Sequence, residues 1–155
     1  MKNFRIDVLS GNIFFDNLRI LPSDEDEFLL VARSLFPKVS KYPADVNLTA
    51  YSNDQLMYGA YAFEAHVWFG NRMLEMLSLD WLGGITQEKG WNSSNSDLIK
   101  DKSSLTRFIQ KISSKKPDQK EEFKDIFTFG WGSIASVGVR REMYSKIDIT
   151  WNHNN

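Results

Sequence analysis

The chain contains no cysteine among its 155 residues. Disulfides, thiolate catalysis and every cysteine-containing metal site are therefore excluded. Histidine is scarce too, because His66 and His153 are the only two. A histidine metal cluster would consequently need carboxylates from elsewhere in the chain. A chain without thiols is typical of a reducing compartment, and we expect a cytoplasmic protein.

Long apolar runs are also missing. No window approaches the roughly 18 consecutive apolar residues that a membrane span requires. The first residues, from Lys2 to Asp7, place charged side chains between apolar ones, whereas a signal peptide needs a continuous apolar stretch. We therefore expect neither export nor a membrane partner.

An excess of charge of one sign is the third absence, because 19 basic side chains oppose 20 acidic ones. No global field favours nucleic acid or an anionic membrane. Lysines are frequent between residues 100 and 124, but acidic residues are interspersed among them, and Phe108 falls on the apolar stripe of a predicted helix. We expect no nucleic-acid partner.

Aromatic residues are abundant instead, with 11 Phe, 5 Trp and 5 Tyr in a composition that is 42% apolar. A globular chain of this length buries roughly 70% of the surface that its unfolded form exposes. The sequence predicts a single domain over residues 1–151 and a disordered tail at 152–155.

Alternation of apolar and polar residues predicts strands near 4–8, 13–15, 46–51, 56–69 and 72–81, and a closing hairpin. In that hairpin Phe127, Phe129 and Trp131 alternate, and Ile147, Ile149 and Trp151 alternate again after a turn at residues 139–142.

Two helices are predicted as well. The first is capped by Ser23 or Asp24 and ends before Pro37, and the second begins at Ser96 or Asp97 and carries an apolar stripe. The expected class is α+β, with an antiparallel sheet of about six or seven strands and two main helices. The order is two strands, a helix, three strands, a helix and two strands.

The middle hairpin carries the side chains with the most chemistry. A two-residue turn at Gly70-Asn71 would place Phe63, Ala65, Val67 and Phe69 on one face, which we expect to be core. The other face would carry Glu64, His66 and Trp68 against Met73, Glu75 and Leu77. This register places His66 directly across from Glu75.

His66 with Glu64 and Glu75 is the best titratable group that the sequence offers. In a cleft a carboxylate could orient the imidazole as a general base, but a cross-strand ion pair is the simpler interpretation. No nucleophile or oxyanion site accompanies the group. The segment Gly130–Ser133 lacks the lysine and the spacing of a phosphate-binding loop. We expect no enzyme, no metal and no cofactor.

Residues 86–97 form the longest polar stretch, and Trp91 alone interrupts it. Loops of this length are either mobile connections or functional elements. A large aromatic residue in an exposed loop is a candidate anchor for a binding partner.

The C-terminal pattern Phe129-Gly130-Trp131-Gly132-Ser133-Ile134, followed by Ser145-Lys146-Ile147-Asp148-Ile149-Thr150-Trp151, resembles the ending of small bacterial proteins that include immunity proteins encoded beside secreted toxins. About a third of the chain carries this resemblance. It implies a cytosolic inhibitor that binds one cognate toxin, occludes its active site and has no catalysis of its own.

The sequence therefore predicts a non-enzymatic immunity protein whose partner-binding residues are Glu64, His66, Trp68, Glu75 and Trp91. Two alternatives stay open. One is a small-ligand-binding domain in which the sheet and helices enclose an aromatic pocket. The other is a hydrolase that depends on His66.

Overall fold

The computed structural model describes residues 2–20, 24–41, 48–52 and 54–153. Within these ranges one sheet contains twelve strands, and three α-helices and one 3-10 turn accompany it. The strands are β1 (Lys2–Ile6), β2 (Ile13–Phe15), β3 (Leu18–Ile20), β4 (Lys38–Lys41), β5 (Leu48–Tyr51), β6 (Leu56–Tyr58), β7 (Tyr61–Gly70), β8 (Met73–Trp81), β9 (Gln119–Lys120), β10 (Lys124–Phe129), β11 (Gly132–Val139) and β12 (Tyr144–Trp151). The helical segments are α1 (Glu25–Ala32), α2 (Ile85–Lys89), η1 (Gly90–Asn92) and α3 (Asn95–Ser113).

The sheet is mixed. Its main path runs β3-β2-β1-β6-β7-β8-β12-β11-β10-β9, and the β4–β5 pair joins it at β7. Strands β1 and β6 pair in parallel through Lys2 and Leu56, while the other described pairs are antiparallel. The α+β class agrees with the sequence, but the prediction of a purely antiparallel sheet of six or seven strands with two helices is wrong.

Two short turns inside apolar runs account for part of this error. Gly59-Ala60 divides the predicted strand 56–69 into β6 and β7, and Gly130-Trp131 divides the first strand of the closing hairpin into β10 and β11. Gly59 has a φ of 61°, a conformation that glycine adopts at little cost. Apolar alternation on both sides of such a turn looks like one continuous strand.

Both predicted helices exist. In α1 the side chain of Asp24 caps the helix by accepting a hydrogen bond from the Glu27 amide at 2.9 Å, as the sequence predicted. In α3 the cap is Ser94 rather than Ser96 or Asp97, because Ser94 and Asp97 form a reciprocal capping box. No helix in the described ranges is long and apolar enough to cross a membrane.

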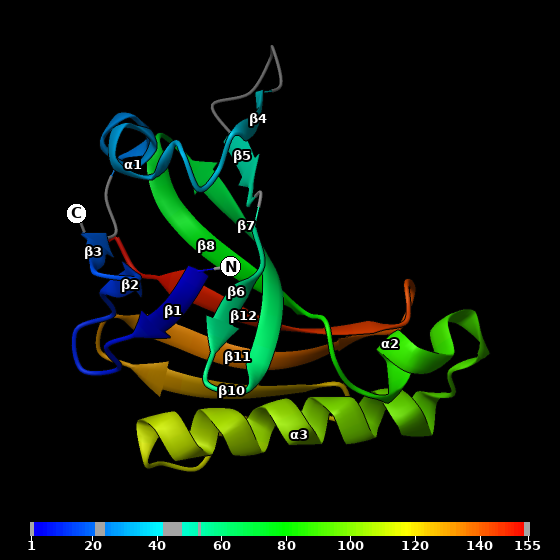
Figure 1. Ribbon diagram of the computed structural model, residues 1–155. Helices are drawn as coiled ribbons and strands as arrows, with labels where there is room; N and C mark the ends of the chain where they lie inside the picture. Colours follow the sequence, from blue (N-terminus) through cyan, green and yellow to red (C-terminus); the bar gives the residue numbers. More distant parts are fainter. Residues whose placement is uncertain (1, 21–23, 42–47, 53, 154–155) are drawn as a thin grey trace.

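The sheet curves around one large core, and Figure 1 shows α3 lying along β10 and β11 while α1 lies at the far end of β8. The side of the sheet that faces α1 and α3 is called here the inner face. Its buried side chains include Phe63, Leu79, Phe127, Ile134, Ile147 and Ile149. Helix α3 adds Leu105, Phe108 and Ile109 to this core.

The two ends of the sheet approach each other through two tryptophans. The Trp131 indole donates to the Val8 carbonyl at 2.8 Å, and the Trp151 indole donates to the Gly11 carbonyl at 2.8 Å. Asn152 and His153, which the sequence assigned to the tail, are hydrogen-bonded to Trp131 and Leu74 respectively. The last part of that predicted tail, residues 154–155, lies outside the described residues.

Candidate functional site on the outer sheet face

The β7–β8 hairpin has a different register from the one predicted. Its two turn residues are Asn71 and Arg72, with φ of 52° and 67°, so that Gly70 pairs with Met73. Positive φ at both positions is the geometry of a type I′ hairpin turn. A bulge then shifts the pairing once more beside Trp68. His66 consequently lies opposite Ser78, and the prediction that it faces Glu75 is wrong.

The assignment of faces within β7 is confirmed. Phe63, Ala65, Val67 and Phe69 are all buried in the core. The alternate residues point to the other side of the sheet, called here the outer face. Leu77 was predicted on that side but is fully buried in the core, because the bulge reverses the alternation along β8.

On the outer face, the polar side chains of three neighbouring strands form two rows. One row is Glu64 on β7, Asp80 on β8 and Lys146 on β12. The second row is His66, Ser78 and Asp148 on the same strands. Together with Trp68 these residues form the candidate site: Glu64, His66, Trp68, Ser78, Asp80, Lys146 and Asp148.

Lys146 and Asp148 form the one ion pair described within this site. The Lys146 ammonium lies 3.2 Å from a carboxylate oxygen of Asp148, and both side chains are about 15% exposed, at 15% and 14%. The Ser78 hydroxyl donates to the other Asp148 oxygen at 2.6 Å. Asp148 is therefore satisfied by neighbours on two strands.

Asp80 does not receive comparable hydrogen bonds. Its Oδ1 atom is buried and has no hydrogen-bond partner among the described residues. Burial raises the pKa of Asp80 from 3.8 to about 6; Lys146 opposes this change, while Asp148 and Glu64 add to it. A carboxylate whose charge is disfavoured, on a face that no described helix covers, is a common feature of functional sites.

The surroundings of His66 disfavour its protonated form. Burial is the main cause that lowers its pKa, and the Lys146 charge acts in the same direction, whereas Asp148 opposes both. Its ring lies 5.5 Å from the ring of Trp68, centroid to centroid. The two rings form a platform beside the charged rows, and Trp68 is 41% exposed.

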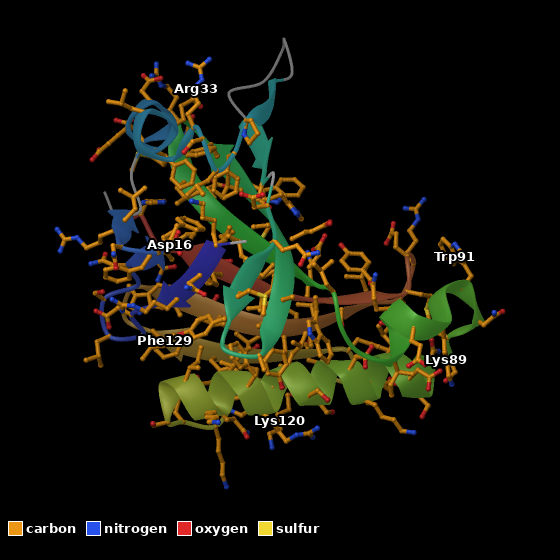
Figure 2. The ribbon with its side chains drawn as sticks, viewed as in Figure 1. Asp16, Arg33, Lys89, Trp91, Lys120 and Phe129 are labelled. Atoms are coloured by element: carbon orange, nitrogen blue, oxygen red, sulfur yellow. The ribbon has the colours of Figure 1, made fainter. Side chains whose placement is uncertain are left out.

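The structure separates the remaining predicted residues. Glu75 is exposed at the bulge, with its carboxylate against the backbone of Gly70. Trp91 is 78% exposed on η1, and Figure 2 shows it at the α2 end of the molecule, apart from β7. Glu64, His66 and Trp68 therefore share one surface that Trp91 does not join.

The polar stretch that carries Trp91 is folded rather than an extended loop. Asp101 of α3 accepts hydrogen bonds from the amides of Ile85 and Thr86, at 2.8 and 2.9 Å, at the start of α2. At the other end of α2, Lys89 forms an ion pair with Asp97 at 3.1 Å. These contacts hold α2 against α3 and present Trp91 on an anchored turn.

The outer face contains Ser, His and Asp side chains in one row, but their hydrogen bonds do not suit nucleophilic catalysis. The Ser78 hydroxyl donates to Asp148 and is fully buried. A nucleophile needs a base that accepts its proton and access to substrate. In the described part of the chain no group of three or more His, Asp or Glu side chains could hold a metal ion.

The core offers little room for a ligand. The cavity between the sheet and α3, lined by Phe4, Leu79 and Ile134 among others, measures about 10 Å³. Such a volume holds at most about one water molecule. An enclosed aromatic pocket, which the small-ligand alternative requires, does not occur at this place.

Asp80, Lys146 and Asp148 were missed by the sequence analysis. Lys146 and Asp148 alternate with the buried Ile147 and Ile149, so their face could be read from the sequence. The face of Asp80 could not, because the bulge reverses the alternation along β8. The pairing of β8 with β12 could not be predicted from the sequence, and it brings residues nearly 70 positions apart into one row.

Comparisons of the chain with protein-family models, with curated proteins and with solved structures find no match. A function is therefore inferred from the residues of the outer face.

Proposed function

We propose that this protein is a non-enzymatic protein-binding domain that engages its partner through the outer face of β7, β8 and β12. The observation that carries the proposal is Asp80, a partly buried carboxylate without a hydrogen-bond partner among the described residues, on a face that also presents Trp68. A carboxylate whose charge is disfavoured destabilises the free protein, and a partner that places a cation over this face would offset the penalty.

The charges of the face indicate the kind of surface that would fit it. Glu64, Asp80 and Asp148 provide three carboxylates and Lys146 provides one ammonium group, which already pairs with Asp148. The complementary surface is therefore basic, with a Lys or Arg side chain opposite Asp80. Trp68 supplies the large, rigid side chain that typically dominates the energy of an interface.

The class of partner in this proposal is a bacterial toxin. The C-terminal pattern of alternating aromatic residues and glycines, which resembles that of immunity proteins, supports this choice. Binding would then occlude the active site of the toxin, and the protein would act in the cytoplasm as a stoichiometric inhibitor. Glu64, His66 and Trp68 stand as contacts on the outer face, and Glu75 and Trp91 as contacts beyond it.

The test is a co-expression assay with the product of the adjacent open reading frame. Cells that produce this neighbour alone should stop growing, and co-expression of the chain should restore growth. Trp68→Ala and Asp80→Asn should weaken the rescue. Leu30→Ala, which truncates an 84% exposed side chain on α1, is the matched control and should rescue fully.

The proposal fails if the neighbour is harmless and does not bind the purified chain. It also fails in its assignment of the surface if Trp68→Ala and Asp80→Asn rescue growth as well as Leu30→Ala does.

A further inference from the structure

A second surface lies where the β6–β7 turn meets the C-terminal half of α3, and Figure 1 shows that turn directly above the helix. The groove between them has a volume of about 530 Å³. This value falls within the range of roughly 300–1,000 Å³ that is typical of small-molecule sites. The groove is separate from the outer face, because it is formed by Tyr58, Tyr61 and α3 side chains that pack on the inner side.

Aromatic rings form the floor of the groove. The Phe108 ring lies 4.6 Å from the Tyr61 ring and 5.0 Å from the Tyr58 ring, centroid to centroid. Ile112 completes the apolar lining. Rings in tilted and edge-on arrangements offer both faces and edges, so a further aromatic ring can pack against them with favourable geometry.

Two cations stand at the rim. Arg107 and Lys111 both line the groove and are exposed, and as an i, i+4 pair they are neighbours on the helix surface. Neither forms an ion pair with a described residue, although the Arg107 guanidinium donates to the Ser104 hydroxyl at 3.1 Å. Two adjacent positive charges beside an apolar floor favour an anionic group on the occupant.

The helix dipole alone does not explain both cations. Helix α3 ends at Ser113, so Lys111 lies in the last turn, where a cation is favoured by the negative end of the dipole. Arg107 lies before that turn, where the effect has fallen off. The dipole therefore does not account for the place of Arg107 at the rim of the groove.

We propose that this groove binds a small aromatic carboxylate. The ring of the ligand packs on Tyr58, Tyr61 and Phe108, and its carboxylate accepts hydrogen bonds from Arg107 and Lys111. This proposal is independent of the outer face and of the protein partner. It assigns to the chain a small-molecule site that lies on the surface and not inside the core.

The test is an NMR titration of the full ¹⁵N-labelled chain with 4-phenylbutyrate and with its uncharged analogue 4-phenylbutanol. The carboxylate should shift the amides of Gly59, Ala60 and Ile112 in a saturable way. It should also bind about five-fold or more tightly than the alcohol, since a charge-assisted contact at an exposed site contributes about 1 kcal/mol.

Three variants decide between a built site and non-specific binding. The double variant Arg107→Gln/Lys111→Gln should lower the affinity for the carboxylate to that for the alcohol. Lys100→Gln makes the same type of charge change on an exposed part of α3, about 10 Å from Arg107 and about 16 Å from Lys111 along the helix axis, and should leave the affinity for both probes unchanged. Ala60→Trp, at an exposed turn position without positive φ, should fill the groove and abolish binding of both probes.

The proposal is overturned if the shifts do not saturate or lie mainly outside the groove. It is equally overturned if the two probes bind with the same affinity, or if Lys100→Gln lowers the affinity for the carboxylate as much as the double variant does. A third contradicting result is that the Ala60→Trp variant keeps the melting temperature of the wild type and still binds the probes. None of these outcomes affects the outer face, because no residue of that face is altered.

Discussion

Asp80 is the residue whose environment conflicts most with its charge. Its neighbours on the outer face are Glu64 on β7 and Lys146, Asp148 and Tyr144 on β12. Burial, followed by the negative charges of Asp80, Asp148 and Glu142, raises the pKa of Tyr144 to about 12. Among the described residues, Lys146 is therefore the one ammonium group near the carboxylates of Glu64, Asp80 and Asp148. Because it cannot neutralise all three, the repulsion between them destabilises the free protein.

This conflict predicts an inverse dependence of stability on pH. The pKa of Asp80 is about 6 in the folded protein and 3.8 as its ordinary value, so the folded state binds more protons between these limits. Its contribution to stability should therefore fall as pH rises from about 4 to about 6. Asp80→Asn should abolish this fall and stabilise the protein at pH 7 by about 1–2 kcal/mol, because solvent screening reduces the penalty of a carboxylate that is only partly buried.

Urea unfolding at pH 4.5, 5.5 and 7 measures this effect. Asp54→Asn, which removes an exposed carboxylate, is the control for the change in net charge. Equal pH profiles for the wild type and Asp80→Asn would show that Asp80 is not the group that titrates in this window.

Replacement of Trp68 or Trp91 by alanine tests whether these two residues contact the partner. Both side chains are exposed, at 41% and 78%, so their replacement by alanine should leave a cooperative unfolding transition. At an interface, truncation of a central tryptophan typically costs about 2 kcal/mol or more, or roughly 30-fold in affinity. Calorimetric titration of the two variants with the partner gives the result. Unchanged affinity together with a lost melting transition would instead make the residue part of the core.

At the scale of elements, α3 is attached to the sheet by a buried polar network. The Lys102 ammonium lies 3.2 Å from a carboxylate oxygen of Asp125, and the Thr106 hydroxyl donates to the other oxygen at 2.8 Å. Ser136 on β11 completes the network beside Thr106. All four residues are buried, and the Lys102 ammonium also donates to the Glu121 carbonyl at 3.2 Å.

Removing Asp125 alone should destabilise the protein much more than replacing both Lys102 and Asp125. Asp125→Ala leaves the Lys102 charge buried and should destabilise the protein by about 3–5 kcal/mol. The double variant Lys102→Met/Asp125→Leu replaces the pair by apolar side chains and should recover most of this loss. Chemical denaturation of both variants measures the difference. Similar stability for the single and double variants would mean that the pair is not coupled.

Local signals were sufficient for helices α1 and α3 and for the faces of β7. The acidic start of α1 with its Asp24 cap, and the alternation of Phe63, Ala65 and Val67, are visible over a few residues. The register of β7 against β8 was wrong because one bulge and a turn displaced by one residue depend on tertiary packing. Helix α2 was missed for the same reason, since Asp101, in another helix, supplies the acceptor for its first amides.

At the scale of the whole molecule, the sheet is closed by contacts between its first hairpin and its last strands. Gly11 lies at this junction with a φ of 79°, and a Cβ there would stand 2.5 Å from the Trp131 ring. Its carbonyl also accepts the hydrogen bond from Trp151. The parallel pairing of β1 with β6 joins residues that lie far apart in the sequence, such as Lys2 and Leu56, and has no local signal.

Gly11→Ala should therefore destabilise the protein more than backbone strain alone predicts. Strain at positive φ and displacement of the Trp131 ring together should cost about 2–4 kcal/mol. Gly59→Ala has a similar φ of 61° but no atom within 4 Å of the added Cβ, and should cost only about 1–2 kcal/mol. The denaturation midpoints of the two variants measure this difference. Equal losses of unfolding free energy would show that the Trp131 ring moves aside without destabilising the protein.

We propose that the outer face of β7, β8 and β12 binds a toxic protein partner. The most direct measurement is a calorimetric titration of the purified product of the adjacent open reading frame with the wild-type chain and with Trp68→Ala. We predict saturable one-to-one binding by the wild type and an affinity at least about 30-fold weaker for the variant. No heat of binding with the wild type, or equal affinity for both chains, would contradict the proposed binding through the outer face.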